Sequence, residues 1–500
     1  MNKTKSAKTL VVIYLLLTVV CVSALQAMEA DTIRVSGIVT DKSDSPLPGA
    51  WVMVKGTSKG TTTEVNGTYS LTIPKNTILQ FSFIGMDTRE IIVEDQQVIN
   101  VKLDDFVTKS IESTGIKPAI PVMLTEIQRK KVEADNGFAF KLFGEVSKQG
   151  DNTFFSPFSF NMALGMLYNG SSGSTRAEMV KALGITDFSE SEINEYYQKM
   201  SHALLEVDPS TEIGIANSIW YRNNLSVKKT FIETGKKYFD AEVLALESNA
   251  AGAINQWCAD KTNNRINNIA ANPIPDDVVM YLINALYFKS KWLSYKKFDK
   301  EKTKLDDFTK TNHQKKKVNM MEQTNSLLYY ADEHLQCVEI PYGNEAFSMV
   351  AILPAEKSNI NQLMKHLDNE KWQNAMNNMR QQRVWLKLPR FKIECDLPLN
   401  QPIMNLGMKQ IFARSANFAN IADTALCVSE IKQKTFVEVN EEGAEAVSVA
   451  DITIISFGKA RRESVAEPVP FFANHPFLYF IMEKSTGAIL FIGRMDEPKE

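Results

Sequence analysis

The pattern of apolar and polar positions changes along the chain. Between residues 31 and 106, short apolar segments alternate with polar positions, as in Ile33, Val35 and Val39, and turn-forming residues separate them. About seven short strands at this spacing predict a small all-β sandwich. Residues 107–129 show no periodicity and contain prolines, which predicts a linker.

Beyond the linker, helical and strand periodicities are mixed. Phe138, Leu142 and Val146 recur at amphipathic helical spacing, whereas residues 284–292 and 388–393 are predicted strands. Together with the preceding sandwich, this mixture predicts a multidomain α+β protein.

A segment near the C-terminus alternates in a different way. As a strand, one of its faces would hold uncharged residues of which the first four are small: Ala444, Ala446, Ser448, Ala450, Ile452, Ile454 and Ser456. The polar, basic residues 458–464 that follow predict an exposed loop. Taken alone, the pattern fits an edge strand before a surface loop, or a strand that is held in reserve for a sheet.

Length and charge narrow the functional classes. Five hundred residues are enough for a large core and more than one domain, and 44% apolar residues are typical of a globular protein. A net charge of -3 provides no basic field for nucleic acid. We therefore expect no nucleic-acid partner.

The N-terminus has the pattern of an export signal. A lysine-containing segment precedes the apolar run Leu10–Val20, and Val22-Ser23-Ala24 supplies small residues before a cleavage point. Residues 1–24 are thus a predicted signal peptide, and the mature chain is expected to be secreted, extracellular or periplasmic. Anchoring as an outer-membrane lipoprotein through Cys21 is the less favoured alternative, because valine is a poor residue at the preceding position.

The remaining cysteines do not form a recognisable framework. They are widely separated, and the chain has no CxxC pair: Cys258, Cys337, Cys395 and Cys427. We expect single buried thiols, with one disulfide as an open alternative.

Motifs for catalysis are also missing from the sequence. It contains no HExxH and no GxSxG, and the P-loop glycine spacing of residues 165–171 has Ser171 where the essential lysine would stand. We expect no catalytic residues, no metal and no cofactor, and hence no enzyme.

The N-terminal strands resemble carboxypeptidase regulatory-like domains. The matching segments are Val35–Asp41, Pro46–Ala50, Val54–Thr57 and Gly60–Thr63. The resemblance implies an accessory or adaptor β-sandwich over residues 31–106, whose partner is unknown.

The larger region resembles the serpins, because a series of motifs follows the order of that family. They are Asn152–Ser159, Asn169–Thr175, Asn284–Trp292, Leu388–Ile393, Glu441–Ala450, Asn474–Ile481 and Phe491–Arg494. The resemblance covers residues 130–498. It implies a serpin fold of three β-sheets with about eight to nine helices, and a reactive-centre loop at about residues 441–470.

The family resemblance also implies an activity. A target endopeptidase would cleave the loop and form a covalent acyl complex, while the hinge inserts as a strand of the central sheet. The targets would be serine endopeptidases, with cysteine endopeptidases as a further class. The inhibitor would be consumed once and would act as a monomer. A non-inhibitory serpin-fold binding or scaffold protein is the alternative, and a surface adhesion module is a third.

The resemblance assigns roles to individual residues. The hinge comprises Glu441, Glu442, Gly443, Ala444, Glu445, Ala446, Ser448 and Ala450. Gly443 gives the backbone freedom where insertion begins, and Ala444 has no charge to desolvate. The shutter and breach positions, where the sheet opens, are Asn152, Ser156, Ser159, Asn284, Trp292 and Gln433. Many animal serpins have histidine where Gln433 stands.

The cleaved bond stays open at this point. The usual length of the loop, counted from Glu441, reaches Phe457 with Gly458 after it, which suits chymotrypsin-like enzymes. Counting back from the C-terminal motif ends several residues later. Arg461 and Arg462 lie between the two positions and suit trypsin-like or papain-like enzymes.

Overall fold

The computed structural model divides into two compact units, at residues 1–116 and 117–500. It describes residues 32–103 and 118–499, apart from 43, 56, 58, 84–85, 87–88, 148–150, 248 and 445–466, and at Ala444 it describes only the backbone. Within these ranges, no helix is long and apolar enough to cross a membrane.

The N-terminal unit contains two small sheets that enclose an apolar core, which confirms the predicted sandwich. Its strands are β1 (Thr32–Thr40), β2 (Trp51–Val54), β3 (Gly60–Thr62), β4 (Thr68–Pro74), β5 (Thr77–Ser82), β6 (Arg89–Val93) and β7 (Val101–Lys102). The strand orders are β4-β1-β7 and β3-β2-β5-β6. Inward positions such as Val35, Val52 and Phe81 are fully buried, as the alternating pattern requires.

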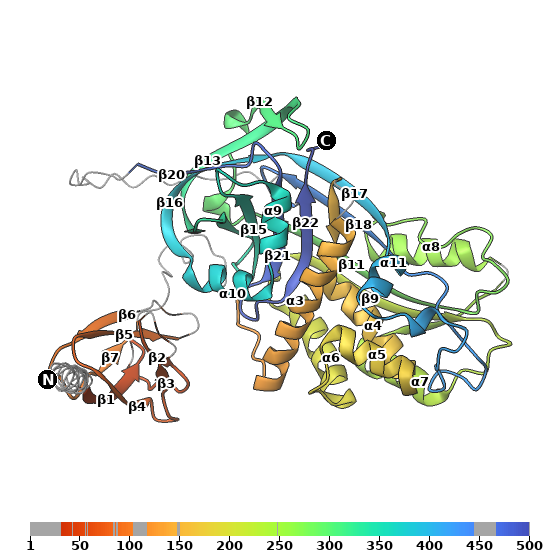
Figure 1. The fold of residues 1–500 in the computed structure, drawn as a ribbon, viewed down its shortest axis with the longest axis horizontal. Coiled ribbons are helices and arrows are strands. Elements are labelled where there is room, and N and C mark those ends of the chain that lie inside the picture. Colours follow the sequence, from red (N-terminus) through yellow and green to blue (C-terminus); the bar gives the residue numbers. More distant parts are fainter. Residues whose placement is uncertain are drawn as a thin grey trace, which may run out of the picture. The chain divides into compact units, whose positions relative to one another are not determined.

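The second unit combines large sheets with flanking helices (Figure 1). Its described helices are α3 (Glu126–Val146), α4 (Pro157–Gly170), α5 (Gly173–Leu183), α6 (Glu190–Glu206), α7 (Lys229–Phe239), α8 (Ala250–Lys261), α9 (Ile360–His366), α10 (Asn369–Asn378) and α11 (Asn400–Asn405). Helix α3 begins with a capping box of Thr125 and Gln128. Helix α4 begins at Pro157 behind the N-cap Ser156, a sequence that favours a helix start.

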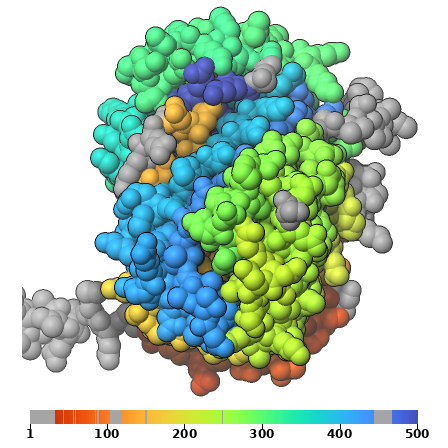
Figure 2. Space-filling model, turned by 90° about the vertical axis from the view of Figure 1, so that its right-hand side faces the viewer, coloured from red at the N-terminus to blue at the C-terminus, as the bar shows by residue number. Residues whose placement is uncertain are grey.

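One sheet of this unit has six strands in the order β10-β9-β11-β19-β18-β17. The strands are β9 (Glu212–Tyr221), β10 (Glu242–Ala245), β11 (Met280–Lys291), β17 (Phe391–Pro398), β18 (Lys432–Asn440) and β19 (Gly443–Ala444). Helix α8 packs on one face of this sheet, with Ile254 and Trp257 in the same apolar cluster as Ile283 and Ala285. Figure 2 shows α8 in green at the surface on this side of the molecule.

The other sheet runs β20-β16-β13-β14-β15-β21-β22-β8, with β12 beside β13. Its strands are β8 (Thr153–Phe155), β12 (Lys304–Thr309), β13 (Lys315–Ala331), β14 (Leu335–Pro341), β15 (Phe347–Pro354), β16 (Arg380–Pro389), β20 (Val469–Phe472), β21 (Phe477–Glu483) and β22 (Ile489–Met495). Most of β13 pairs with β12 and β16, whereas its last residues, Leu328 to Ala331, pair with β14. This one long strand therefore joins two of the three expected sheets into a continuous hydrogen-bonded sheet.

The prediction of one strand through residues 388–393 was wrong in detail. Strand β16 ends at Pro389 and β17 begins at Phe391, so the chain changes sheets at Arg390. The amide of Arg390 donates to Asn319 O on β13 at 2.8 Å, so it still bonds to the sheet that contains β16 rather than to the sheet that contains β17. This turn places the Arg390 guanidinium close to the end of β18, where it meets Glu441.

Candidate functional site

The candidate site lies where the short strand β19 sits between β11 and β18. Gly443 and Ala444 pair antiparallel with Lys291 and Ser290 on one side and with Asn440 and Val439 on the other. Among the described residues, β11 and β18 have no backbone pairing with each other and are connected only through β19. The start of the predicted hinge is thus already a strand of the sheet.

Gly443 fits this position because it has no side chain. Its φ is +143°, and an added Cβ would lie 2.2 Å from Ser290 O and 2.5 Å from Lys291 Cα. Both atoms belong to the backbone and cannot rotate away. Any larger residue would therefore push β19 away from β11.

Trp292 fixes the chain just before the hinge. Its buried indole N–H donates to Asn440 O at 2.8 Å, and its amide donates to Glu442 O at 2.8 Å. The indole stacks on Tyr342 with 4.4 Å between ring centroids and an interplanar angle of 9°. The predicted breach position is therefore both packed and hydrogen-bonded to the hinge, and the contribution of Tyr342 was not anticipated.

Glu441 is a buried acid held by two donors. Arg390 Nη2 lies 2.6 Å from its Oε1, and the Thr303 hydroxyl donates to the same oxygen at 2.7 Å. Burial raises the pKa of Glu441, but the two contacts lower the pKa by more than burial raises it. The net pKa therefore lies below its ordinary value. By contrast, Glu442 forms a more exposed ion pair with Lys300 at 3.0 Å.

Further down the sheet, Gln433 is bonded to the start of α4. Its Oε1 accepts from Ser156 N at 2.8 Å, and its Nε2 donates to Ser156 O at 3.0 Å. The Ser156 hydroxyl donates to Leu490 O at 2.7 Å and also caps α4 by accepting from Ser159 N. The Ser156 side chain therefore caps α4 and at the same time bonds to the backbone of β22.

A second chain of polar contacts starts at Ser159. Its hydroxyl donates to Asn284 Oδ1, and Asn284 Nδ2 donates to Asn217 Oδ1 at 2.7 Å. Asn217 Nδ2 in turn donates to Phe239 O at 2.5 Å. Sequence reasoning missed Asn217, although a polar residue within the apolar run of β9 is a usable signal.

Asn152 lies apart from this network. Its Oδ1 accepts from the amides of Asp496 and Glu497 at 2.7 and 2.9 Å, and its Nδ2 donates to Glu497 O. It lines an open polar pocket of about 410 Å³. The structure therefore brings Ser156, Ser159, Asn284 and Gln433 together by hydrogen bonds, whereas Asn152 bonds to the C-terminal residues Asp496 and Glu497 instead.

The remaining predicted site residues lie outside the described part of the chain. These are Glu445, Ala446, Ser448 and Ala450 of the hinge, and Phe457, Gly458, Arg461 and Arg462 of the loop. The four cysteines after the predicted signal are free thiols, and Cys427 is exposed rather than buried. No group of three or more potential metal-binding side chains occurs in the part of the chain that the structure describes.

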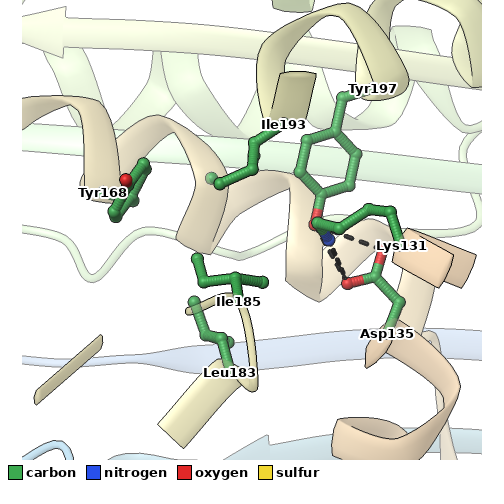
Figure 3. Close-up of a pocket in the computed structure, with 8 residues that line it drawn as sticks. Lys131, Asp135, Tyr168, Leu183, Ile185, Ile193 and Tyr197 are labelled. Atoms are coloured by element: carbon green, nitrogen blue, oxygen red, sulfur yellow. Dashed lines mark hydrogen bonds and ion pairs between the residues drawn. The ribbon is translucent and has the colours of Figure 1, made fainter. Parts of the chain in front are cut away.

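A buried ion pair on α3 lies beside a cavity of about 10 Å³ (Figure 3). Lys131 Nζ contacts Asp135 Oδ1 and lies 3.0 Å from the Tyr197 hydroxyl. Burial lowers the pKa of Lys131 and raises that of Asp135, although the charge of each partner acts in the opposite sense. With room for about one water, the cavity offers no substrate site.

Comparisons with known proteins agree with this geometry. The family model described as "Serpin (serine protease inhibitor)" matches residues 133–498. The CarboxypepD_reg-like domain model matches residues 35–112.

Several relatives match nearly their full length. Serpin B3 of Homo sapiens is 32% identical over 396 residues, covering 73% of this chain and 99% of its own. An uncharacterized serpin-like protein of Thermococcus kodakarensis is 32% identical, covering 76% and 88%. Iripin-1 of Ixodes ricinus is 29% identical, covering 76% and 100%.

The solved structures point the same way. The thermophilic serpin tengpin in its native state is 30% identical, with a TM-score of 0.67 over 76% of this chain and 97% of its own. Native protease nexin-1 with heparin is 26% identical, with a TM-score of 0.66 over 74% and 100%. The matched family is described as one of serine protease inhibitors, which points away from an enzyme.

Proposed function

This chain belongs to the serpin family, and we propose that it is an exported suicide inhibitor of serine endopeptidases. The observation that carries the proposal is β19, since the hinge already occupies a strand position between β11 and β18. Strand insertion needs such a starting point, because only the first paired residues fix the register for those that follow. The predicted signal peptide supports export.

The register of β19 specifies how insertion would continue. Extending it pairs Ala446 with Phe288 and Val437, Ser448 with Leu286 and Thr435, and Ala450 with Asn284 and Gln433. The small face of the hinge would then turn toward the side of the sheet on which Leu286, Thr435 and Val437 are buried. No charge on that face would need to be desolvated. Insertion would reach the network of Ser159, Asn284 and Gln433 at Ala450, six residues after Ala444.

The proposed chemistry uses the groups of the target enzyme. Its serine Oγ attacks the carbonyl carbon of the bait bond, the C–N bond breaks, and the new amine leaves with the proton. The resulting ester joins the enzyme to the new C-terminus of the bait. Insertion of the hinge must displace the enzyme before water hydrolyses that ester, and a metastable native state supplies the free energy.

The class of protease that this chain would inhibit depends on the sequence of the bait loop, which lies within residues 445–466. Cleavage between Phe457 and Gly458 agrees with the usual distance from the hinge, and cleavage after Arg461 or Arg462 agrees with trypsin-like or papain-like chemistry. We rank the bond after Phe457 first, because a longer inserted segment delays displacement of the enzyme.

Incubation of the mature chain with trypsin, chymotrypsin, elastase and papain tests the proposal. We expect an SDS-resistant covalent complex with at least one of the serine enzymes, loss of its activity, and release of a C-terminal peptide. The mass of that peptide identifies the bond. Cleavage of the loop without a complex or loss of enzyme activity across this panel would instead indicate a non-inhibitory serpin.

A further inference from the structure

The tryptophans of the larger unit are unequally distributed between core and surface. Trp220, Trp257, Trp292 and Trp372 are buried, whereas Trp385 on β16 is 37% exposed. Burying the ring of a tryptophan is strongly favourable, and an exposed apolar side chain that has further apolar neighbours beside it marks a candidate interaction site. Trp385 lies on the strand next to β20, which begins shortly after the bait loop.

The exposed ring is nevertheless held in one orientation. Its Nε1 donates to Glu322 Oε1 at 2.8 Å, and it packs edge-to-face on Phe472 with 4.9 Å between centroids. Lys387 Nζ lies 5.9 Å from the Trp385 ring and 5.5 Å from the Phe472 ring, and is itself bound to Asp306 at 3.1 Å. An aromatic side chain that is already ordered loses little entropy on binding.

The neighbours of Trp385 extend this surface. Pro470 on β20 and Thr324 on β13 are its cross-strand partners, and both are exposed. Arg383 precedes Trp385 by two residues, so it lies on the same face of β16, and it is exposed. Aromatic residues and arginine are enriched at the centres of protein interfaces, whereas serine and lysine are depleted there.

We propose that Trp385, Phe472, Pro470 and Arg383 form a secondary docking patch for the body of the target endopeptidase, outside its active-site cleft. This inference rests on the proposed function. We expect the matching enzyme surface to offer apolar side chains for Trp385 and a carboxylate for Arg383.

The short distance along the chain between the bait bond and β20 supports the target endopeptidase as the partner of this patch. Val469 follows Arg462 by seven residues and Phe457 by twelve, so the bait bond lies at most about 25 to 40 Å from the start of β20. An endopeptidase of about 230 residues has a radius of gyration of about 17 Å. Its body, held at the bait, can therefore rest on the surface beside β20.

Rates of complex formation with the enzyme that the wild type traps test this patch. In the full mature chain, Trp385→Ala should slow inhibition about tenfold or more, as expected for loss of a central aromatic contact, with the stoichiometry unchanged. Trp385→Phe should restore part of the rate. Arg383→Glu, at an exposed position that should not affect folding, should slow inhibition and weaken its dependence on salt.

The matched control is Leu205→Ala, which removes another exposed apolar side chain, on α6. It should leave the rate unchanged. If Trp385→Ala and Arg383→Glu both trap the enzyme within twofold of the wild-type rate, the docking patch is overturned while the inhibitory function stands. If the wild type itself forms no complex, the proposed function fails and the patch fails with it.

Discussion

The carboxamide of Gln433 forms a closed pair of hydrogen bonds with the backbone of Ser156, accepting from its amide at 2.8 Å and donating to its carbonyl at 3.0 Å. Only a group that accepts at one atom and donates at the other can do this. The carboxamide of glutamine does not ionise over the ordinary pH range, so it keeps this property throughout. The link between β18 and the start of α4 is therefore independent of pH in this protein, whereas a histidine at this position would titrate.

Gln433→Glu tests this pairing with almost no change in shape. A carboxylate cannot donate to Ser156 O, and a buried charge costs desolvation, so we expect unfolding free energy to fall by about 1–3 kcal/mol at pH 7. Burial raises the pKa of the new acid. The loss should therefore shrink as pH falls through this raised pKa and be smallest below about 4.3, where the protonated acid again donates. Urea unfolding at pH 4 and 7 measures both effects, and Gln382→Glu, at an exposed position on β16, should change neither.

Gly443→Ala should impair insertion rather than folding. The new Cβ would meet Ser290 O at 2.2 Å, so β19 must separate from β11. Insertion would then start more slowly, and more acyl-enzyme would hydrolyse before it is trapped. We expect the moles of inhibitor consumed per mole of enzyme to rise several-fold.

Gly184→Ala is the control for backbone strain at that position. Gly184 also has a positive φ, +67°, but no atom lies within 4 Å of its added Cβ. It should cost about 1–2 kcal/mol of stability from the left-handed backbone and leave the stoichiometry of inhibition unchanged. An equal rise in both variants would show that the contact with β11 is irrelevant.

Glu441 gives the hinge a dependence on acid. Because its folded pKa is below the ordinary value, its contribution to stability is present above about pH 4.5 and is lost as pH falls through the folded pKa. Glu441→Gln removes the charge-assisted bond to Arg390, so we expect a loss of about 1.5–3 kcal/mol at pH 7. The difference from wild type should narrow between pH 5 and 3.

Glu442→Gln provides the comparison for that variant. Its ion pair with Lys300 is more exposed, with the lysine side chain 61% accessible, so its loss should cost no more than about 1 kcal/mol. Urea midpoints at pH 3, 5 and 7 distinguish the two. Parallel pH profiles for wild type and Glu441→Gln would contradict the assignment to Glu441.

Local patterns predicted most of the elements, because burial on one face is written in the sequence of each strand or helix. The inward positions of β18, such as Val437 and Val439, are buried as alternation requires. The order of motifs then identified the fold and placed Ser156, Ser159, Asn284 and Gln433 in one network. These residues lie on the regular elements β11, β18 and α4 or at its N-cap, whose geometry the sequence constrains.

The misplaced and missed residues depend on long-range contacts instead. Asn152 binds backbone groups of residues 496 and 497, and no local periodicity reports such a partner. Thr303 reaches Glu441 from a separate turn. Arg390 connects two sheets because the chain changes direction there, although the surrounding residues are equally suited to one continuous strand.

The buried pair of Lys131 and Asp135 allows a direct comparison within α3. Both residues are buried and bound to Tyr197, whereas Glu126 and Lys130, also four residues apart on this helix, are exposed. The two pairs differ mainly in burial. Replacing each with apolar or neutral residues therefore measures what burial adds to one kind of ion pair.

Lys131→Met should be strongly destabilising, because it leaves the Asp135 carboxylate buried without its cation, a change that costs about 3–5 kcal/mol. The double variant Lys131→Met/Asp135→Leu should recover most of this loss, since no charge then remains to be desolvated. Removal of Lys131 also raises the pKa of Asp135 further, so the cost should grow as pH rises from 4 to 7.

Lys130→Met on the exposed pair should cost at most about 0.5 kcal/mol. Urea unfolding of the four variants measures the coupling, and additive losses for Lys131→Met and Asp135→Leu would show that the buried charges do not interact.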